Sequence, residues 1–487
     1  MFFNSFEFAF FLPVAFLVYW LLIGKSTRSQ NIAVIGLSYF FYGFWDWRFL
    51  GLIILSTVLD FVIGIALENS KKKRSKKLFL CLSIFVNLGI LLFFKYYNFF
   101  TLSFASCFSF FGQKIDPFTL DVLLPVGISF YTFQTLSYTI DVYRGKIRAC
   151  NDIFAFSSFV CFFPQLVAGP IERAQDLLPQ FYEKRKFKIE LAIDGLQQIL
   201  WGLFKKIVIA DQSAKIANLI FDNPTEYNGF SLFIGAMFFS FQIYGDFSGY
   251  SDIAIGTSKL FGISLKKNFS FPYFSRDIGE FWRKWHISLS TWFKDYMYIP
   301  LGGSKGGRIS QIRNIFIIFL VSGLWHGANW TYVAWGFVNA LYFIPLGIRN
   351  KNRSHLDVVA QNSILPSARE IIQMCSTYIL TCIAWIFFRA ENIYDAIAYI
   401  NNMTVGVLHK QGYVDCVNLF YWKVGWKIPV IILLFFVLEW TGRREKYGIA
   451  QWLFFRSRTL RWILYYLIII CVISYLGSKE EFIYFQF

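Results

Sequence analysis

"IFIIFLVSGLWHGANWTYVAWGFVNALYFIPL", residues 315–346, is the stretch that decides how this chain folds. It belongs to a run of about 35 residues without a formal charge, between Arg313 and Arg349. As one continuous helix this run would be about 50 Å long, whereas a hydrocarbon core is about 30 Å thick. The run must therefore break. Broken backbone inside a bilayer is tolerated only where protein buries it or where it lines a wet cavity.

The break is expected at GLWHGANW, where Gly323, Gly327 and Asn329 interrupt the apolar pattern. His326 lies about 13 residues beyond Arg313, and at 1.5 Å per residue that places it roughly 20 Å deep, near the middle of the bilayer. The sequence thus predicts a histidine that is held in the membrane beside a cavity.

His326 is the strongest candidate for chemistry, because ionisable groups at membrane depth are costly and tend to mark sites where a proton moves. Desolvation disfavours the imidazolium, so we expect a neutral ring that can take the proton of a hydroxyl attacking an acyl carbonyl. Asn329 is expected to orient the imidazole or to donate a hydrogen bond to the developing oxyanion. The alternative is a core histidine that binds a carbonyl or Asn329 and ties helices together.

His286 lies in an element of another kind, DIGEFWRKWHISLSTWFKDYMY at 277–298. Its apolar stripe of tryptophan, leucine, phenylalanine and tyrosine predicts one amphipathic helix at the cytoplasmic interface, with charged residues on the other face. Asp277 with Glu280 resembles a capping box, and Glu280 with Lys284 is a well-oriented i,i+4 pair. Because His286 falls within the apolar stripe, it either packs in the interior or helps to position a thioester donor.

The whole chain has the composition of an integral membrane protein. Its 487 residues are 56% hydrophobic, 21% aromatic and only 16% charged. At about 20 residues per span, its apolar runs predict an all-α polytopic membrane protein with roughly 10 to 13 spans. The runs are 8–23, 32–44, 49–67, 78–94, 122–140, 153–167, 230–244, 315–346, 371–388, 428–440 and 462–475.

The net charge of +17 comes from short basic clusters between apolar runs, which favours membrane topology over nucleic-acid binding. The clusters at 25–28, 71–77 and 143–148 are the natural cytoplasmic loops, and all three fall on one face if the N-terminus starts outside. Glu7 and Pro13 interrupt the first apolar run and no basic region precedes it, which is not the pattern of a cleavable signal peptide. We therefore expect this run to stay as a span. The eight cysteines form no CxxC pair and are expected to be apolar fillers, with no metal and no permanently bound cofactor.

The chain is expected to form a single membrane domain, 1–487, with three textures. Residues 1–115 are simple spans, 116–350 mix apolar runs with Gly, Pro, Asp, Asn and His, and 351–487 are C-terminal spans. Chemistry should lie in the second part. The longest polar stretches are too short for an independent soluble core, so a bulky hydrophilic partner must be a separate protein. No inverted repeat is visible, which weakens a channel or transporter interpretation.

Charged residues in apolar or glycine-rich surroundings give further candidates. Asp246 and Asp252 lie in the otherwise apolar QIYGDFSGYSDIAIG, and we expect Arg or Lys partners for these buried carboxylates. LGGSKGGR, residues 301–308, is a basic glycine-rich loop that either holds a phosphate or forms a flexible turn. PQLVAGPIER, residues 164–173, has the prolines and glycine of a re-entrant or kinked segment.

These stretches together resemble the membrane-bound O-acyltransferase (MBOAT) family, and more narrowly the branch that contains the alginate O-acetyltransferase membrane subunit. The matching motifs span residues 1 to about 340 and in combination are highly specific. Beyond 350 only general membrane character is recognised. The motifs are MFFNSFEFAFFLPV, LPVGISFYTFQTLSYTIDVYRG, PQLVAGPIER, QIYGDFSGYSDIAIG, NFSFPYFSRDIGEFWRKWHISLSTWFKDYMYIPLGG and SGLWHGANWTYVAWG.

The resemblance implies a ring of tilted helices around a central funnel, with re-entrant and interfacial helices. It implies that His326 matches the family's catalytic histidine and His286 its second one. It also implies that an acyl group passes from a cytoplasmic thioester through the bacterial inner membrane to an extracytoplasmic polysaccharide, often with a separate SGNH-hydrolase-like periplasmic protein to finish the transfer.

We therefore expect a multi-pass acetyltransferase that uses acetyl-CoA as its acyl donor, acts with that periplasmic partner and binds no nucleic acid. Lys266, Lys267, Lys305 and Arg308 are expected to attract the phosphates of acetyl-CoA. Three alternatives remain. The chain is a D-alanyl transferase that modifies teichoic acid from a carrier protein, a non-enzymatic polysaccharide export channel, or a scaffold that recruits periplasmic enzymes.

Overall fold

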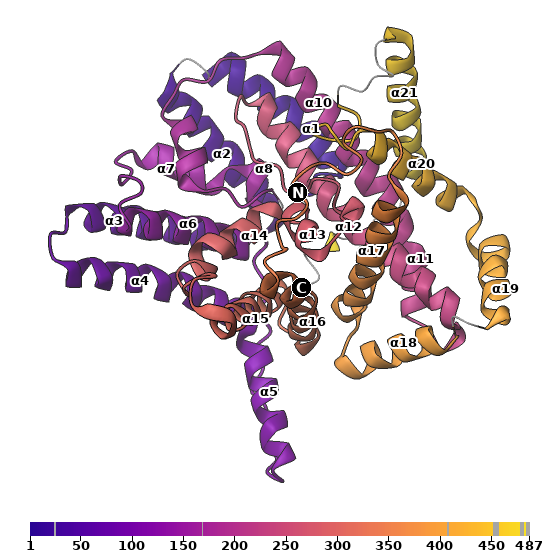
Figure 1. Ribbon diagram of the computed structural model, residues 1–487. Helices are drawn as coiled ribbons and strands as arrows, with labels where there is room; N and C mark the ends of the chain where they lie inside the picture. The colour runs from indigo at the N-terminus through magenta and orange to yellow at the C-terminus, as the bar shows by residue number, and fades with distance from the viewer. Residues whose placement is uncertain (24–25, 168, 407–408, 451–456, 478–481, 484–487) are drawn as a thin grey trace. The chain divides into compact units, whose positions relative to one another are not determined.

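The computed structural model describes residues 1–487 except 24–25, 168, 407–408, 451–456, 478–481 and 484–487, and within the described residues all regular structure is helical (Figure 1). The chain forms two compact units. The first contains residues 1–196 and 254–266, and the second contains 197–253 and 267–487. Each unit is described by itself below.

The first unit is built from nine helices and parts of two more. These are α1 (Phe6–Leu17), α2 (Thr27–Asp46), α3 (Leu50–Asn69), α4 (Lys73–Leu91), α5 (Tyr97–Phe110), α6 (Ile128–Tyr143), α7 (Ile153–Cys161), α8 (Phe163–Leu166), α9 (Ala174–Leu177), most of α10 (Ile189–Leu203) and the end of α12 (Gly229–Leu260). α6 packs along α3 and α4, and α7 packs on α2. The count refers to the described part of the unit.

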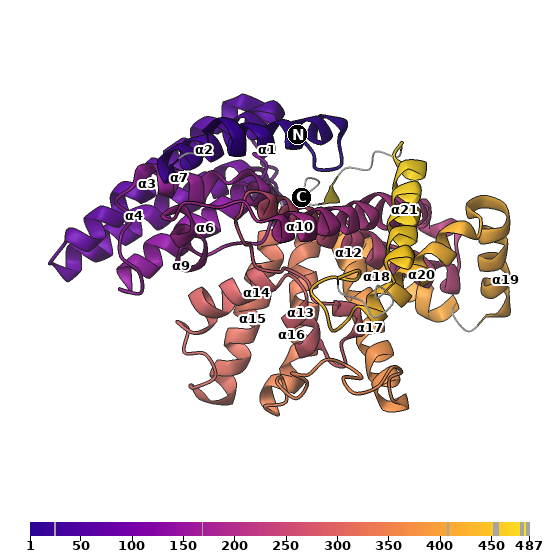
Figure 2. The ribbon, with the colours of Figure 1, turned by 90° about the horizontal axis from the view of Figure 1, so that it is seen from above.

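The second unit holds most of α12 and the C-terminal half of the chain. Its other helices are α11 (Asp211–Phe221), α13 (Ile278–Lys284), α14 (Ile287–Phe293), α15 (Gly307–His326), α16 (Trp330–Ile348), α17 (Ala368–Arg389), α18 (Ile393–Gly406), α19 (Lys410–Asn418), α20 (Lys427–Thr441) and α21 (Arg458–Tyr475). α15, α16 and α17 lie side by side in sequence order (Figures 1 and 2). A π-helical segment, η5 (Phe204–Ala210), follows α10.

Seven helical segments among the described residues are long and apolar enough to cross a membrane, so the protein is a multi-pass membrane protein. Two of them, Thr27–Asn69 and Lys73–Phe110, each join two helices. Several predicted runs form shorter helices instead, including α6 with 16 residues, α7 with 9 and α20 with 15. Apolar composition predicts burial in lipid or protein, whereas prolines and polar residues decide where each helix ends.

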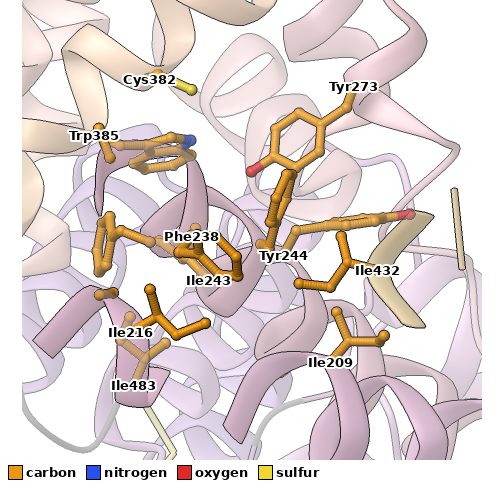
Figure 3. Close-up of a cluster of buried hydrophobic side chains, with 14 of the residues drawn as sticks. Ile209, Ile216, Phe238, Ile243, Tyr244, Tyr273, Cys382, Trp385, Ile432 and Ile483 are labelled. Atoms are coloured by element: carbon orange, nitrogen blue, oxygen red, sulfur yellow. The ribbon is translucent and has the colours of Figure 1, made fainter. Parts of the chain in front are cut away.

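The core of the second unit is rich in aromatic side chains (Figure 3). Aliphatic side chains surround Tyr244 of α12, Trp385 of α17 and Tyr273, which lies in the short 3-10 helix Pro272–Phe274. The ring centroids of Tyr244 and Tyr273 are 5.2 Å apart. Large rings bury much apolar area and pack edge to face, which fixes neighbouring helices firmly. This core therefore holds α12 and α17 on either side of the segment that carries His286.

Candidate functional site

The predicted break in the 315–346 run is confirmed. α15 ends at His326, α16 begins at Trp330, and the two helices run antiparallel as a tight hairpin, with Gln311 Nε2 donating to the carbonyl of Gly347 at 3.0 Å. Gly327, at the C-cap, and Asn329, at the N-cap of α16, form the break as predicted.

Gly323 does not form part of the break, because it lies within α15 and has a packing role. A Cβ atom on Gly323 would lie 2.2 Å from the carbonyl oxygen of Tyr332, and one on Gly336 would lie 2.3 Å from that of Phe319. The two glycines therefore allow the backbones of α15 and α16 to touch. This close packing sets where His326 lies at the end of the hairpin.

The predicted single amphipathic helix at 277–298 is wrong, because it is interrupted at His286. α13 ends at Lys284, α14 begins at Ile287, and His286 has the left-handed backbone angles φ 42° and ψ 55°. Two backbone hydrogen bonds hold this turn against the preceding segment. Ile287 N donates to the Asn268 carbonyl at 2.9 Å, and Ser270 N donates to the Lys284 carbonyl at 3.0 Å.

The break brings His286 to His326, although the two residues lie on different elements. Their ring centroids are 6.5 Å apart with an interplanar angle of 60°. His286 is 1% exposed and His326 is 3% exposed. The two rings are therefore close enough to act on the same reacting group. We call these two residues the histidine pair.

Aromatic side chains surround the histidine pair. Trp325 and Trp335 lie 5.0 Å from the His326 ring and Phe388 lies 5.4 Å from it, while Phe247 meets the His286 ring edge to face at 4.6 Å. These neighbouring rings are apolar, and the wet cavity that the sequence predicted at this depth stays a prediction. Phe388 belongs to α17, beyond the part of the chain to which the family motifs extend. Only general apolar character marked it in the sequence.

His286 is held by a side chain that the sequence analysis did not single out. Asn268, 1% exposed, places its Oδ1 3.0 Å from His286 Nδ1 and also accepts from Ser288. Burial lowers the pKa of His286, which lies between the candidate spans, to about 3. The ring is therefore neutral at pH 7, as a base must be. A polar residue that precedes an apolar, aromatic run was the signal for Asn268.

Asn329 makes the contacts of a helix cap. Its Oδ1 accepts from Thr331 N at 3.0 Å, and its Nδ2 donates to the Glu391 carbonyl at 2.9 Å. These bonds fix the start of α16 and tie it to the segment after α17. A direct role of Asn329 at the imidazole stays a prediction.

The four predicted phosphate-binding cations differ in their partners. In the first unit, Lys266 Nζ pairs with Asp176 at 2.5 Å. In the second, Lys267 donates to Ser270 Oγ at 3.1 Å, and partial burial followed by the nearby Lys284 ammonium lowers its pKa. Lys305 and Arg308 are exposed at the start of α15.

Charged groups around α13 are more buried than predicted. The Asp277 half of the predicted capping box and the Glu280–Lys284 pair are confirmed, at 2.7 Å each, but the Glu280 carboxylate accepts from Arg276 N instead of closing the box. Glu280 is 1% exposed, however, and binds Arg276, which also pairs with Asp357 at 3.0 Å. Although burial alone raises it, the hydrogen bond from Arg276 and the charge of Lys284 lower the pKa of Glu280. This network anchors the 351–370 connection to the helix that precedes His286.

The predicted partners of Asp246 and Asp252 are present. Lys206 Nζ lies 2.8 Å from Asp246 and 2.8 Å from Asp211, and Lys205 Nζ lies 2.5 Å from Asp252. We call these five side chains the lysine–aspartate cluster. Nearly every charge in it has an opposite charge in contact, which is the condition for burying ions. Within the described residues, no three His, Cys, Asp or Glu side chains gather as a metal ion requires.

Taken together, an all-helical membrane fold and two buried imidazoles at a broken helix define a membrane-bound O-acyltransferase. The family model described as MBOAT, membrane-bound O-acyltransferase family, matches residues 146–386. The chain belongs to this family and is an O-acyltransferase.

Among the relatives compared below, the O-acetylating members match at higher identity and over more of the chain than the D-alanyltransferase. It is 38% identical to the probable alginate O-acetylase AlgI of Pseudomonas aeruginosa over 459 residues, which cover 92% of this chain and 82% of the relative. It is 34% identical to the peptidoglycan O-acetyltransferase of Helicobacter pylori over 81% of this chain and 77% of the relative. The teichoic acid D-alanyltransferase of Bacillus subtilis is 29% identical over 44% of this chain and 57% of the relative.

Proposed function

We propose that this protein moves an acetyl group from cytoplasmic acetyl-CoA across the membrane for O-acetylation of an extracytoplasmic polysaccharide. The relatives named as O-acetylating enzymes support acetyl as the acyl group, because they match at 34–38% identity over 81–92% of the chain. The D-alanyltransferase of Bacillus subtilis matches at 29% over 44%. Alginate and peptidoglycan are both extracytoplasmic glycans, so the two acetylating relatives support a polysaccharide acceptor.

The observation that carries the proposal is the histidine pair, because two buried imidazoles with ring centroids 6.5 Å apart in apolar surroundings suit a proton transfer that water would disturb. In the proposed step, His326 takes the proton of the acceptor hydroxyl while the hydroxyl oxygen forms a bond to the thioester carbonyl carbon. The carbon–sulfur bond then breaks, and the departing thiolate takes the proton back from the imidazolium. His286 assists in positioning the reacting groups.

The donor is proposed to approach from the basic side of the hairpin. Lys305 and Arg308 stand exposed at the start of α15, and the pairing of Gln311 with Gly347 shows that α16 ends beside that start. Lys267, with Lys284 nearby, adds positive charge next to Asn268. Phosphates of acetyl-CoA are attracted to such exposed cations. Lys266 is already paired with Asp176, so we expect it to contribute least.

A periplasmic SGNH-hydrolase-like protein is proposed as the partner that completes the transfer, and the bacterial inner membrane as the location. The sequence supports a separate partner, since its polar connections are too short to form a soluble catalytic domain. Basic clusters between the first spans support one cytoplasmic face.

Inside-out membrane vesicles test this function and its direction. Radiolabelled acetyl-CoA is added outside the vesicles, where the cytoplasmic face is exposed, and polymer-bound label in the lumen is measured. We expect His326→Ala and His286→Ala each to lower the rate by at least about 100-fold, because general-base catalysis contributes about 10²–10⁴-fold. His409→Ala is the matched control at an exposed histidine and should keep the wild-type rate.

The rivals give different results in the same vesicles. An export channel would lose polymer transport while acetylation of the remaining polymer stayed normal in the histidine variants. A scaffold would tolerate both alanine changes provided that the protein is inserted. A D-alanyl transferase would transfer label from a D-alanyl carrier protein and leave acetyl-CoA unused. Wild-type rates in His326→Ala would overturn the assignment of that residue.

A further inference from the structure

Asn268 stands out among the buried polar side chains of the second unit. Three donors converge on its Oδ1 atom, which are His286 Nδ1 at 3.0 Å, Ser288 Oγ at 2.9 Å and Ser288 N at 3.3 Å. Its backbone carbonyl also accepts from Ile287 N at 2.9 Å. One asparagine therefore contacts His286 and both of the residues that follow it.

These contacts determine which nitrogen of His286 carries the hydrogen. A backbone N–H can only donate, so the atom of Asn268 that Ser288 N meets is the carbonyl oxygen and not the amide nitrogen. The same oxygen faces His286 Nδ1, and because a carbonyl oxygen can only accept a hydrogen bond, Nδ1 must be the donor. The hydrogen of the neutral ring therefore lies on Nδ1, and the lone pair lies on Nε2.

We propose that Asn268 is a positioning residue that holds His286 in the tautomer with its hydrogen on Nδ1, so that Nε2 presents a lone pair to the reacting group. The inference rests on the proposed function of the histidine pair and adds to it. Through Asn268, the ring acquires both a fixed tautomer and a fixed orientation, which is how a second side chain usually prepares an imidazole for chemistry.

A purely structural role does not account for all of the contacts. The turn at His286 is already held by the backbone bonds of Ile287 and Ser270, neither of which needs the side chain of Asn268. Asn268 Nδ2 is buried and has no hydrogen-bond partner within the described structure. The side chain of Asn268 is therefore not needed to hold the turn, and what it adds is the contact with His286 Nδ1.

Nitrogen NMR reads the tautomer without any assay of activity. The chain has only four histidines, so ¹⁵N-histidine labelling of the detergent-solubilised protein gives few signals, and His286→Gln assigns the one of interest. We expect His286 to carry its hydrogen on Nδ1 in the wild type and in Asn268→Asp, and to populate both tautomers in Asn268→Ala. A wild-type His286 with its hydrogen on Nε2 would overturn the inference.

The kinetic test uses the same two variants in the vesicle assay. Asn268→Ala removes the acceptor, and we expect kcat to fall by about 10–100-fold with KM changed by less than about 3-fold, as for other residues that orient an imidazole. Asn268→Asp keeps the acceptor, so kcat should recover to within about 10-fold of the wild type. The new carboxylate stabilises the imidazolium form and so raises the pKa of His286. In a plot of kcat against pH, the acid limb should therefore move to higher pH.

Asn31→Ala is the matched control, because Asn31 is a buried asparagine of the first unit that donates to the Phe181 carbonyl. It should leave kcat per folded molecule and the His286 tautomer unchanged. Wild-type kcat in Asn268→Ala, or an Asn268→Asp as inactive as Asn268→Ala, would refute the positioning role. Failure of the proposed function is distinguishable, because His286→Ala would then remain active whatever the tautomer.

Discussion

The histidine pair and the lysine–aspartate cluster lie in the same unit but bury their polar atoms in opposite surroundings. Lys205 and Lys206 meet carboxylates within 2.5–2.8 Å. The histidine pair instead meets tryptophan and phenylalanine rings at 4.6–5.4 Å. Matched ions in a protein interior serve the fold, whereas imidazoles in an apolar site keep their capacity for a ligand. The comparison separates the residues that hold the structure from those that act.

The largest expected effect on stability comes from breaking the lysine–aspartate cluster at its centre. Lys206→Met leaves Asp211 and Asp246 buried without their common cation, which should lower the free energy of unfolding by about 3–5 kcal/mol. Thermal unfolding of the detergent-solubilised protein measures this. Adding Asp211→Asn and Asp246→Asn should restore most of the loss, since no unpaired charge then remains.

Lys294→Met is the matched control for the cluster. Lys294 pairs with Asp295 at 3.5 Å, and the two side chains are 52% and 24% exposed. An exposed pair contributes about 0–1 kcal/mol, so the unfolding temperature should barely change. An equal loss in both variants would show that burial of the cluster does not matter.

The hairpin glycine gives the next largest effect. Gly323→Ala places a Cβ 2.2 Å from the Tyr332 carbonyl, so α15 and α16 must separate, at a cost of about 1–3 kcal/mol. The same displacement moves His326, and kcat should fall by more than the stability loss explains. Gly36→Ala is the control, since nothing lies within 4 Å of its added Cβ, and it should be neutral or stabilising. Wild-type stability and rate in Gly323→Ala would show that the hairpin is not closely packed.

These glycines also show what the sequence could and could not predict. Charge-free length required a break in the 315–346 run, and the sequence located it correctly at Gly327 and Asn329. Gly323 was assigned to the break as well, because a glycine that allows close helix packing looks the same in sequence as one that ends a helix.

The histidine pair was predictable as two residues but not as a pair. His326 was identified from its depth in an uncharged run. The amphipathic pattern around His286 predicted one continuous helix, because periodicity does not reveal a left-handed residue that distant backbone bonds hold in place. Phe388 belongs to α17, a later helix, and Asn268 lies in the segment 18 residues before His286. Only tertiary packing brings them to the site.

Substitutions of Asn329 test whether this residue holds the structure or acts in the reaction. As a helix cap, its loss in Asn329→Ala should cost about 1 kcal/mol of stability. Asn329→Asp keeps the N-cap oxygen but loses the donor to the Glu391 carbonyl, so it should lose part of the stability and retain kcat per folded molecule. A stable Asn329→Asp without activity would instead assign the amide to the oxyanion, as the sequence suggested. Unfolding and initial rates measured on the same preparations separate the two roles.

The smallest expected effect is the pH dependence that the buried His286 adds to stability. Its pKa is about 3 in the folded protein and about 6.5 when exposed, so the unfolded chain binds a proton more readily between these values. The contribution of the neutral ring is therefore nearly complete above about pH 7 and is lost as the pH falls through 6.5, by about 1.4 kcal/mol at pH 5.5. His286→Gln removes this titration. The difference in unfolding free energy between wild type and variant should thus shrink or reverse from pH 7.5 to pH 5.5. A difference that stays constant over this range would mean that the pKa of His286 is the same in the folded and the unfolded protein. The contrast between the histidine pair and the lysine–aspartate cluster would then disappear.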